Sequence, residues 1–240
     1  MKRALIETLV TVPQGNELDL ILGAFDAAGY PPRSSTIGRL ECHLIDVLAL
    51  LFTVGGHGKT QHAVQTQHLI EQKPTIQAVI CAGAAGSLSP DLKLGDVVVG
   101  LSTVEHDYKL RFVQRPLPRH DADRRLADEF RSVAGQIGSR FSMLFGAIAS
   151  GDEDVVDPAR AAELRKATGA SCVAWEGAGA ARAAGFSRRP FLELRAITDN
   201  ADHSAPGDFR THLKLAMPNL AQVLLTWSLL RGRRRSGARG

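Results

Sequence analysis

Acidic side chains follow an apolar segment in the last quarter of the chain. The stretch LRAITDNAD, residues 194–202, starts apolar and then carries Thr198, Asp199 and Asp202. This pattern predicts a strand that opens into a loop, and the loops after strands usually hold the ligand-binding groups of α/β folds. A carboxyl group placed there can transfer protons, but its position alone does not define a reaction.

A glycine-rich turn, GGHGKT at residues 55–60, has the Gly-Lys-Thr ending of a nucleotide-triphosphate loop. That loop needs a glycine five positions before Gly58, where this chain has Thr53. We therefore interpret the turn as a passage from strand to helix whose free N–H groups can face a ligand.

The histidines and cysteines do not form the spacing of a metal site. His57, His62 and His68 lie five and six residues apart, which does not bring all three to one helical face, so we expect solvated histidines and no metal. Three cysteines stand far apart in apolar segments and are expected to be buried and reduced: Cys42, Cys81 and Cys172.

Length and composition fit one α/β domain. The chain has 240 residues, of which 22% are charged and 44% hydrophobic. Apolar runs such as 47–54 and 220–230 are shorter than the roughly 20 residues of a membrane helix, and no secretory leader is evident, so we expect a cytoplasmic protein without membrane contact. The net charge of +4 comes from five arginines within residues 231–239. We predict a domain at 1–230 and a basic disordered tail at 231–240, with nucleic-acid binding not expected.

Strand-like and helix-like segments alternate along the chain. This alternation predicts a single α/β domain of three layers, a central mostly parallel mixed sheet flanked by helices. Glu17 falls in the first turn of an expected helix at 17–27, after Asn16 as its N-cap, where the helix dipole favours an acid. The strands are expected at 4–12, 35–45, 47–54, 78–82, 95–104, 142–149, 172–175 and 191–197, and the other helices at 59–72, 123–137, 158–166, 176–185 and 209–230.

Three segments occur in the order found in a known enzyme family. They are ICAGAAGSLSPDLKLGDVVV (80–99), VAWEGAGA (173–180) and LRAITDNAD (194–202). Together they resemble the methylthioadenosine/S-adenosylhomocysteine nucleosidases of the nucleoside phosphorylase and nucleosidase superfamily. The resemblance implies a nucleoside phosphorylase-like fold and hydrolysis of the N-glycosidic bond of a purine nucleoside, with release of adenine and without a cofactor.

The resemblance assigns three catalytic carboxyl groups. Asp199 would protonate the purine at N7, and Glu176 would hold the 2′- and 3′-hydroxyls of the ribose and favour the cationic sugar. Glu17 would orient and deprotonate water at the anomeric carbon. Each positioned acid or base is typically worth ~10²–10⁴ in rate.

The same resemblance implies a set of substrate-binding residues. Small residues at 83–86 let the backbone approach a sugar, and an aromatic replaces the family's methionine at 175. The loop that starts with the His-Asp pair at 106–107 is expected to reach a neighbouring subunit. The substrate-binding residues are expected to be Gly83, Ala84, His106, Phe112, Val155, Trp175 and Thr198.

Several positions depart from the family pattern. Ala174 replaces the first glutamate of its Glu-Met-Glu motif, and Asp154 stands where an aromatic side chain usually lies against the purine. Cys81 and Ala84 occupy the positions of the phosphate-binding arginine and serine of the hexameric phosphorylases. Without these partners a phosphate dianion would be costly to bury, which favours water as the nucleophile.

Two alternatives stay open at this level. A phosphate-dependent purine nucleoside phosphorylase would use an arginine from another loop, and a nucleoside-binding protein without turnover would account for Ala174 and Asp154. The expected partners are a small-molecule nucleoside and a second copy of the chain in a homodimer.

Overall fold

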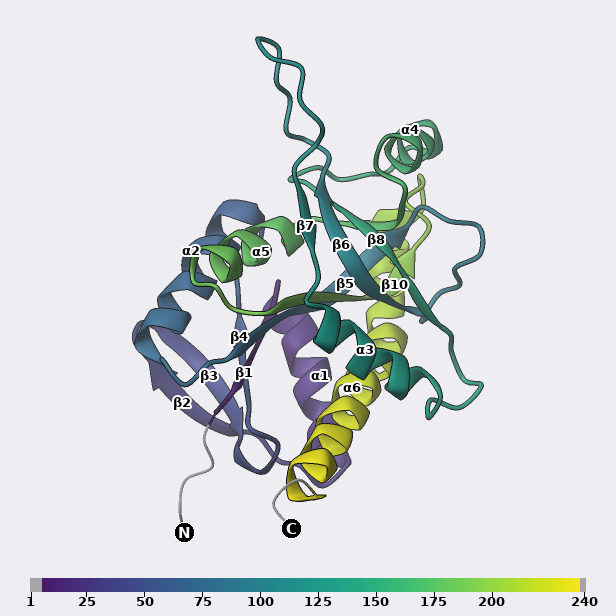
Figure 1. Cartoon of the computed structure of the whole chain (residues 1–240). Helices are drawn as coiled ribbons and strands as arrows, with labels where there is room; N and C mark the ends of the chain where they lie inside the picture. Colours follow the sequence, from purple (N-terminus) through teal and green to yellow (C-terminus); the bar gives the residue numbers. More distant parts are fainter. Residues whose placement is uncertain (1–5, 238–240) are drawn as a thin grey trace.

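Helices and strands alternate along the chain in the computed structural model, which describes residues 6–237 (Figure 1). The strands are β1 (Thr8–Val12), β2 (Arg33–Ile37), β3 (Leu40–Ile45), β4 (Leu50–Val54), β5 (Ala78–Ser87), β6 (Val97–Glu105), β7 (Arg119–Asp121), β8 (Met143–Ser150), β9 (Ala170–Ala174) and β10 (Phe191–Asp199). The helices are α1 (Gly15–Ala27), α2 (Lys59–Gln72), α3 (Arg124–Ala134), α4 (Pro158–Thr168), α5 (Gly177–Phe186) and α6 (Ala205–Gly237), with a 3-10 turn η1 (Asp46–Leu48).

The strands form one mixed sheet built from two parallel blocks. Strands β4, β1, β5 and β10 run parallel to one another, and so do β6, β8 and β9. Antiparallel pairs join the blocks on two sides, β10 with β6 and β5 with β9, so that five strands close into a ring. The predicted α/β class with a central mixed sheet flanked by helices is confirmed.

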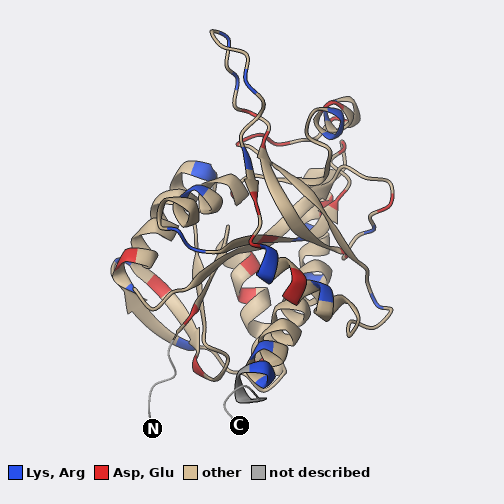
Figure 2. Cartoon of the chain, in the orientation of Figure 1, with Lys and Arg blue, Asp and Glu red and all other residues tan. Residues whose placement is uncertain are grey.

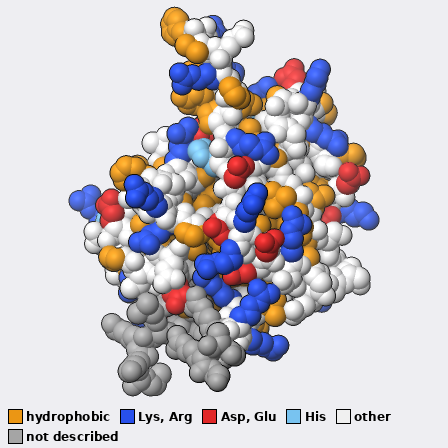
Figure 3. Space-filling model, viewed as in Figure 1, with side chains coloured by type: hydrophobic (Ala, Val, Ile, Leu, Met, Phe, Trp, Pro, Cys, Tyr) orange, Lys and Arg blue, Asp and Glu red, His pale blue; other side chains and the backbone are white. Residues whose placement is uncertain are grey.

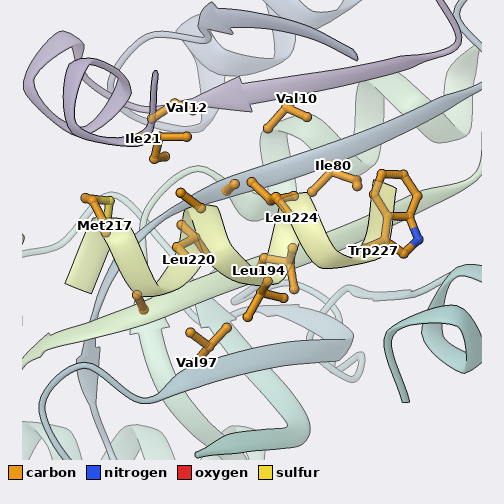
Figure 4. Close-up of a cluster of buried hydrophobic side chains, with 14 of the residues drawn as sticks. Val10, Val12, Ile21, Ile80, Val97, Leu194, Met217, Leu220, Leu224 and Trp227 are labelled. Atoms are coloured by element: carbon orange, nitrogen blue, oxygen red, sulfur yellow. The ribbon is translucent and has the colours of Figure 1, made fainter. Parts of the chain in front are cut away.

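Helices cover both faces of the sheet. On one face α6 packs against α1, α3, β5 and β10, while α2 and α5 pack together on the other (Figure 1). Figure 4 shows how α6 contributes to the core, with Leu220 and Leu224 facing Val10, Ile80 and Leu194 of the strands. This continuous apolar contact fixes α6 on the sheet, and the first turn of α6 thereby lies beside the end of β10.

Several elements are longer than the sequence predicted, β5 and α1 among them. The small residues expected to form a loop after residue 82 instead continue β5 to Ser87, because that stretch is buried and pairs with β10 and β9. Helix α1 begins after Gln14 rather than after Asn16.

The basic C-terminal segment also differs from its prediction. Helix α6 continues past residue 230 to Gly237, so that most of the segment expected to be a disordered tail is helical. Arg231 explains part of this continuation, because it donates to Thr8 Oγ1 at 2.9 Å and lies over the Trp227 ring at 5.1 Å. Figure 2 marks positions of Lys and Arg in blue on the ribbon near this end of α6. Residues 238–240 lie outside the described part of the chain.

Candidate active site

A cavity of about 370 Å³ lies where the strands of the ring end. Its walls come from the end of β5, from β9 and β10 with the residues that follow them, from the loops after β1 and β8, and from the start of α6. Segments distant in the sequence therefore meet at one edge of the sheet, the place where α/β folds bind small molecules.

Glu17 is a buried carboxyl group on the cavity wall. It stands in the first turn of α1 with 2% of its surface exposed, and its Oε2 accepts the Ala84 N–H at 2.9 Å. Burial raises the pKa of Glu17 to about 7, helped by the negative charge of Glu176 and opposed by the Ala84 hydrogen bond and Arg195. A carboxyl group with this pKa can accept a proton near neutral pH. An acid placed only for the helix dipole would be solvated, so its burial points to a role in the cavity.

Three groups hold the Glu176 carboxylate at the N-terminus of helix α5. It precedes the first residue of α5, and its Oε1 accepts the Gly58 N–H at 3.3 Å and lies 3.3 Å from His57 Nδ1. Its Oε2 accepts from Arg195 Nη2, also at 3.3 Å. These contacts orient a buried carboxylate toward the cavity that it lines.

Asp199 ends β10 and lines the same cavity. Its Oδ2 accepts from Thr198 Oγ1 at 2.9 Å and its Oδ1 accepts the Ala201 N–H at 3.0 Å. Burial raises the pKa of Asp199 above its ordinary value, although these two hydrogen bonds oppose the shift. A raised pKa suits a carboxylic acid that donates a proton.

Arg195 connects the Glu176 carboxylate with the backbone of β5 at Ala84. Its guanidinium is 1% exposed and donates through Nε to Glu193 Oε1 at 2.8 Å, through Nη1 to the Ala84 carbonyl at 3.2 Å, and through Nη2 to Glu176. Cys81 Sγ lies 3.5 Å from the same Nη2. All three nitrogen atoms of Arg195 are therefore engaged by protein groups.

The structure brings most of the predicted site residues together. All three predicted catalytic carboxyl groups line the cavity, and so do four of the predicted substrate-binding residues: Ala84, Val155, Trp175 and Thr198. Asp154, noted as a departure from the family pattern, also lines the cavity and is exposed.

Three predicted substrate-binding residues lie elsewhere. Gly83 is not part of the cavity wall; a Cβ added there would lie 2.6 Å from Glu17 Oε2 and 2.9 Å from Arg195 Nη1, so Gly83 leaves room for these side chains. The His106 ring is buried against Gly151, outside the cavity. Phe112 is fully exposed on the segment between β6 and β7, so within one chain neither residue reaches the cavity.

Sequence reasoning missed several residues in the site and directly behind it. His57 lines the cavity and stacks on Trp175, with ring centroids 4.2 Å apart, and Phe209 adds a second aromatic wall. Glu193 and Arg195 lie in the segment FLELRAIT, which we interpreted only as an apolar strand. Two opposite charges at a spacing of two share one face of a strand, and that was the available signal.

His62 corrects the expectation of solvated histidines. The ring is buried, with Nδ1 2.9 Å from the Gly56 carbonyl and Nε2 2.8 Å from Thr11 Oγ1. Burial lowers the pKa of His62 to about 4. The ring therefore fixes the turn that carries His57 and Gly58.

Two further searches concern only the described residues, 6–237. Among them no group of three or more His, Cys, Asp or Glu side chains is placed to hold a metal ion. None of the helices in this range is long and apolar enough to cross a membrane.

Comparisons with known proteins agree with this geometry. The family model described as "Phosphorylase superfamily" matches residues 8–227. The aminodeoxyfutalosine nucleosidase of Helicobacter pylori is 32% identical over 154 residues, covering 62% of this chain and 67% of that protein. The 5′-methylthioadenosine/S-adenosylhomocysteine nucleosidase of Shewanella denitrificans is 28% identical over 185 residues, covering 73% and 79%.

A solved structure shows the same arrangement of the chain. The 5′-methylthioadenosine/S-adenosylhomocysteine nucleosidase of Neisseria meningitidis, in complex with methylthio-immucillin-A, superposes with a TM-score of 0.81 and 28% identity. The match covers 93% of this chain and 98% of that one.

Proposed function

This chain belongs to the phosphorylase superfamily and is a nucleosidase, an N-glycosyl hydrolase, and we propose that it cleaves adenine nucleosides with a 5′-thio substituent, 5′-methylthioadenosine and S-adenosylhomocysteine. The membership confirms the family predicted from the three sequence motifs. The observation that carries the proposed reaction is the convergence of Glu17, Glu176 and Asp199 on one cavity, and the choice of 5′-thio nucleosides is supported by the substrates named for the relatives.

The three carboxyl groups divide the work of hydrolysis in this proposal. Asp199, whose pKa is raised by burial, acts as the general acid and donates a proton to N7 of the purine as the bond between N9 and the anomeric carbon breaks. Glu176 accepts hydrogen bonds from the 2′- and 3′-hydroxyls and stabilises the positive charge that develops on the sugar. Glu17 removes a proton from water, whose oxygen bonds to the anomeric carbon. The products are adenine and the free 5-thio-substituted ribose.

Water rather than phosphate is supported as the nucleophile by the state of Arg195. Its three guanidinium nitrogens already bind Glu193, Ala84 and Glu176, and the two carboxylates among these partners offset the positive charge that an anion would need. Arg210 lines the cavity as well, but it is exposed at the opening on α6. A dianion between Glu17 and Glu176 would also be repelled by their charges.

Base release tests the function directly. Purified protein is given methylthioadenosine, adenosylhomocysteine, adenosine and inosine, with and without phosphate, while free base and sugar are measured. We expect adenine and a reducing sugar from the first two substrates without phosphate. Strict dependence on phosphate with a sugar 1-phosphate product would identify a phosphorylase, and tight binding without release would identify a nucleoside-binding protein.

A homodimer is the second part of the proposal. Two sets of apolar side chains are exposed, Val64 and Phe186 on α2 and α5, and Tyr108, Leu110, Phe112 and Val113 on the projecting segment between β6 and β7. Figure 3 shows hydrophobic side chains along this projection at the top of the view. Such surface is normally covered by a partner. In a dimer, Phe112 lines the cavity of the second copy near the 5′ substituent.

Subunit complementation tests this arrangement. Asp199→Asn and Phe112→Ala variants are each expected to be impaired, because each removes one side chain from every site of its own homodimer. Mixed after reversible dissociation, they form heterodimers in which one site has both Asp199 and the partner's Phe112, so activity returns. A monomer by light scattering, or no recovery on mixing, would refute the shared site.

A further inference from the structure

A further buried carboxylate, Glu193, stands behind the site without touching the cavity. It lies on β10 with no exposed surface, two residues before Arg195 on the same face of the strand. Its Oε1 accepts from Arg195 Nε at 2.8 Å, and its Oε2 accepts from Thr103 Oγ1 of β6 at 2.5 Å. Each oxygen of this carboxylate is therefore held by a defined donor.

The chain makes room for this carboxylate at the start of α5. A Cβ added to Gly177, the first residue of α5, would lie 2.1 Å from Glu193 Oε2 and 2.2 Å from its Cδ and Oε1. Any side chain at position 177 would displace the carboxylate. The positive end of the α5 dipole also stabilises a negative charge at this place. Gly177 and Thr103 thus fix the position of the Glu193 carboxylate.

The positive charge of Arg195 explains the role of the Glu193 carboxylate. A guanidinium stays protonated, and a buried one needs carboxylate partners. Among the described residues, Arg195 forms ion pairs with Glu176 and Glu193. Without Glu193, Glu176 alone would have to neutralise Arg195, and its oxygens would turn from the cavity toward the guanidinium.

We propose that Glu193 is a positioning residue of the hydrolytic site, which neutralises Arg195 so that Glu176 stays free to bind the ribose hydroxyls. The inference rests on the proposed function. The loss of a family glutamate at Ala174 gives this charge its importance: Ala174 ends β9 and Glu193 lies on β10, two strands that both pair with β5, so the chain has a carboxylate on β10 where the family has one on β9.

A charge-removing substitution of similar size tests the role. Glu193→Gln retains the volume beside Gly177 but leaves Arg195 with one carboxylate. We expect kcat/KM for methylthioadenosine to fall about 100-fold, because a misplacement of about 1 Å in a positioned group has that effect. The Kd of free adenine, which does not contact Glu176 in the proposed pose, should change less than about 2-fold. Glu163→Gln on the exposed face of α4 is the matched control and should retain full activity.

A double-mutant cycle separates the positioning role from a general effect on folding. Gly177→Ala should reproduce the loss by pushing the carboxylate away, yet have no further effect in a Glu193→Ala background, where the space is empty. Melting temperatures identify any variant that fails to fold, and Glu193→Gln then carries the test. Three results would overturn the inference. The losses in kcat/KM from Gly177→Ala and Glu193→Ala could be additive, Glu193→Gln could weaken the binding of adenine and of nucleoside equally, or Glu193→Gln could leave kcat/KM unchanged. Absence of base release from the wild type would instead refute the proposed function, and the inference with it.

Discussion

The inner wall of the cavity and its opening are built differently. The inner wall consists of Glu17, Glu176, Arg195 and Asp199, all less than 9% exposed and each held by hydrogen bonds from strands or helix ends. The opening consists of side chains that are exposed or half exposed, among them His57, Asp154, Val156, Phe209 and Arg210.

The two regions differ in what they share with the family. The carboxyl groups of the inner wall are those that the resemblance assigns to catalysis. Two departures from the family pattern, Asp154 and Trp175, are exposed or half exposed, and only the third, Ala174, is a buried part of the wall. Buried, interlinked groups are costly to change, while exposed side chains can be exchanged with little effect on stability. We infer that the reaction is set by the inner wall and that substrate preference is set by the opening.

The largest effect is expected from Asp199→Asn. An amide cannot donate a proton to N7 as an acid does, so kcat should fall ~10²–10⁴-fold, equivalent to about 3–5 kcal/mol of barrier. Adenine release under saturating methylthioadenosine measures it. Asp128→Asn, on the exposed face of α3 and not part of the cavity wall, is the control. A loss below about 10-fold would exclude Asp199 as the general acid.

The pH dependence of kcat/KM examines Glu17 at the inner wall. Glu17 is the base in the proposed mechanism and its pKa is raised to about 7, so activity should rise about tenfold per pH unit up to that pH. Glu17→Gln should lower kcat/KM and remove this limb, whereas Asp19→Asn on the exposed face of α1 should retain it. If kcat/KM of Glu17→Gln still rose with pH in the same way, the titration would belong to another group.

The same residue predicts a pH-dependent stability. The pKa of Glu17 rises from 4.5 to about 7 on folding, so its contribution is fully present below pH 4.5 and is lost as the pH rises through 7. Relative to Glu17→Gln, the wild type should lose about 3 kcal/mol of unfolding free energy across this range. Urea unfolding at pH 5 and pH 8 measures the difference, and a parallel course of the two proteins would contradict it.

The smallest effect is expected at the opening. Asp154→Phe places a ring where the family usually has one, and base stacking of about 0.5–1.5 kcal/mol should lower KM for adenine nucleosides about 2- to 10-fold. Asp154→Ala removes the charge without adding a ring and serves as the control. An equal gain from both variants would show that charge rather than stacking controls binding, and a change in kcat would blur the distinction between wall and opening.

Local patterns and the family motifs predicted much of the architecture. The bounds of α2 agree with its expected range, and the alternation of strands and helices gave the fold class. Glu17, Glu176 and Asp199 were assigned by resemblance, and their common cavity depends on pairings between strands far apart in sequence.

The misses have a shared physical cause. Small residues after position 82 have weak strand preference, so only pairing with β10 and β9 makes them a strand. The ion pair between Glu193 and Arg195 can be recognised as part of the site only once both side chains are known to be buried. The expected roles of His106 and Phe112 depend on a second copy of the chain and stay predictions.

Strand β10 pairs on both of its edges, parallel with β5 and antiparallel with β6, and it carries Glu193, Arg195, Thr198 and Asp199 along its length. The proposed proton donor, Asp199, and Arg195, which anchors the proposed sugar-binding carboxylate, therefore belong to a single cooperative segment. Amide hydrogen exchange along β10 should therefore be among the slowest in the protein. A fluctuation that opens β10 would displace Arg195 and Asp199 together and abolish activity in that molecule.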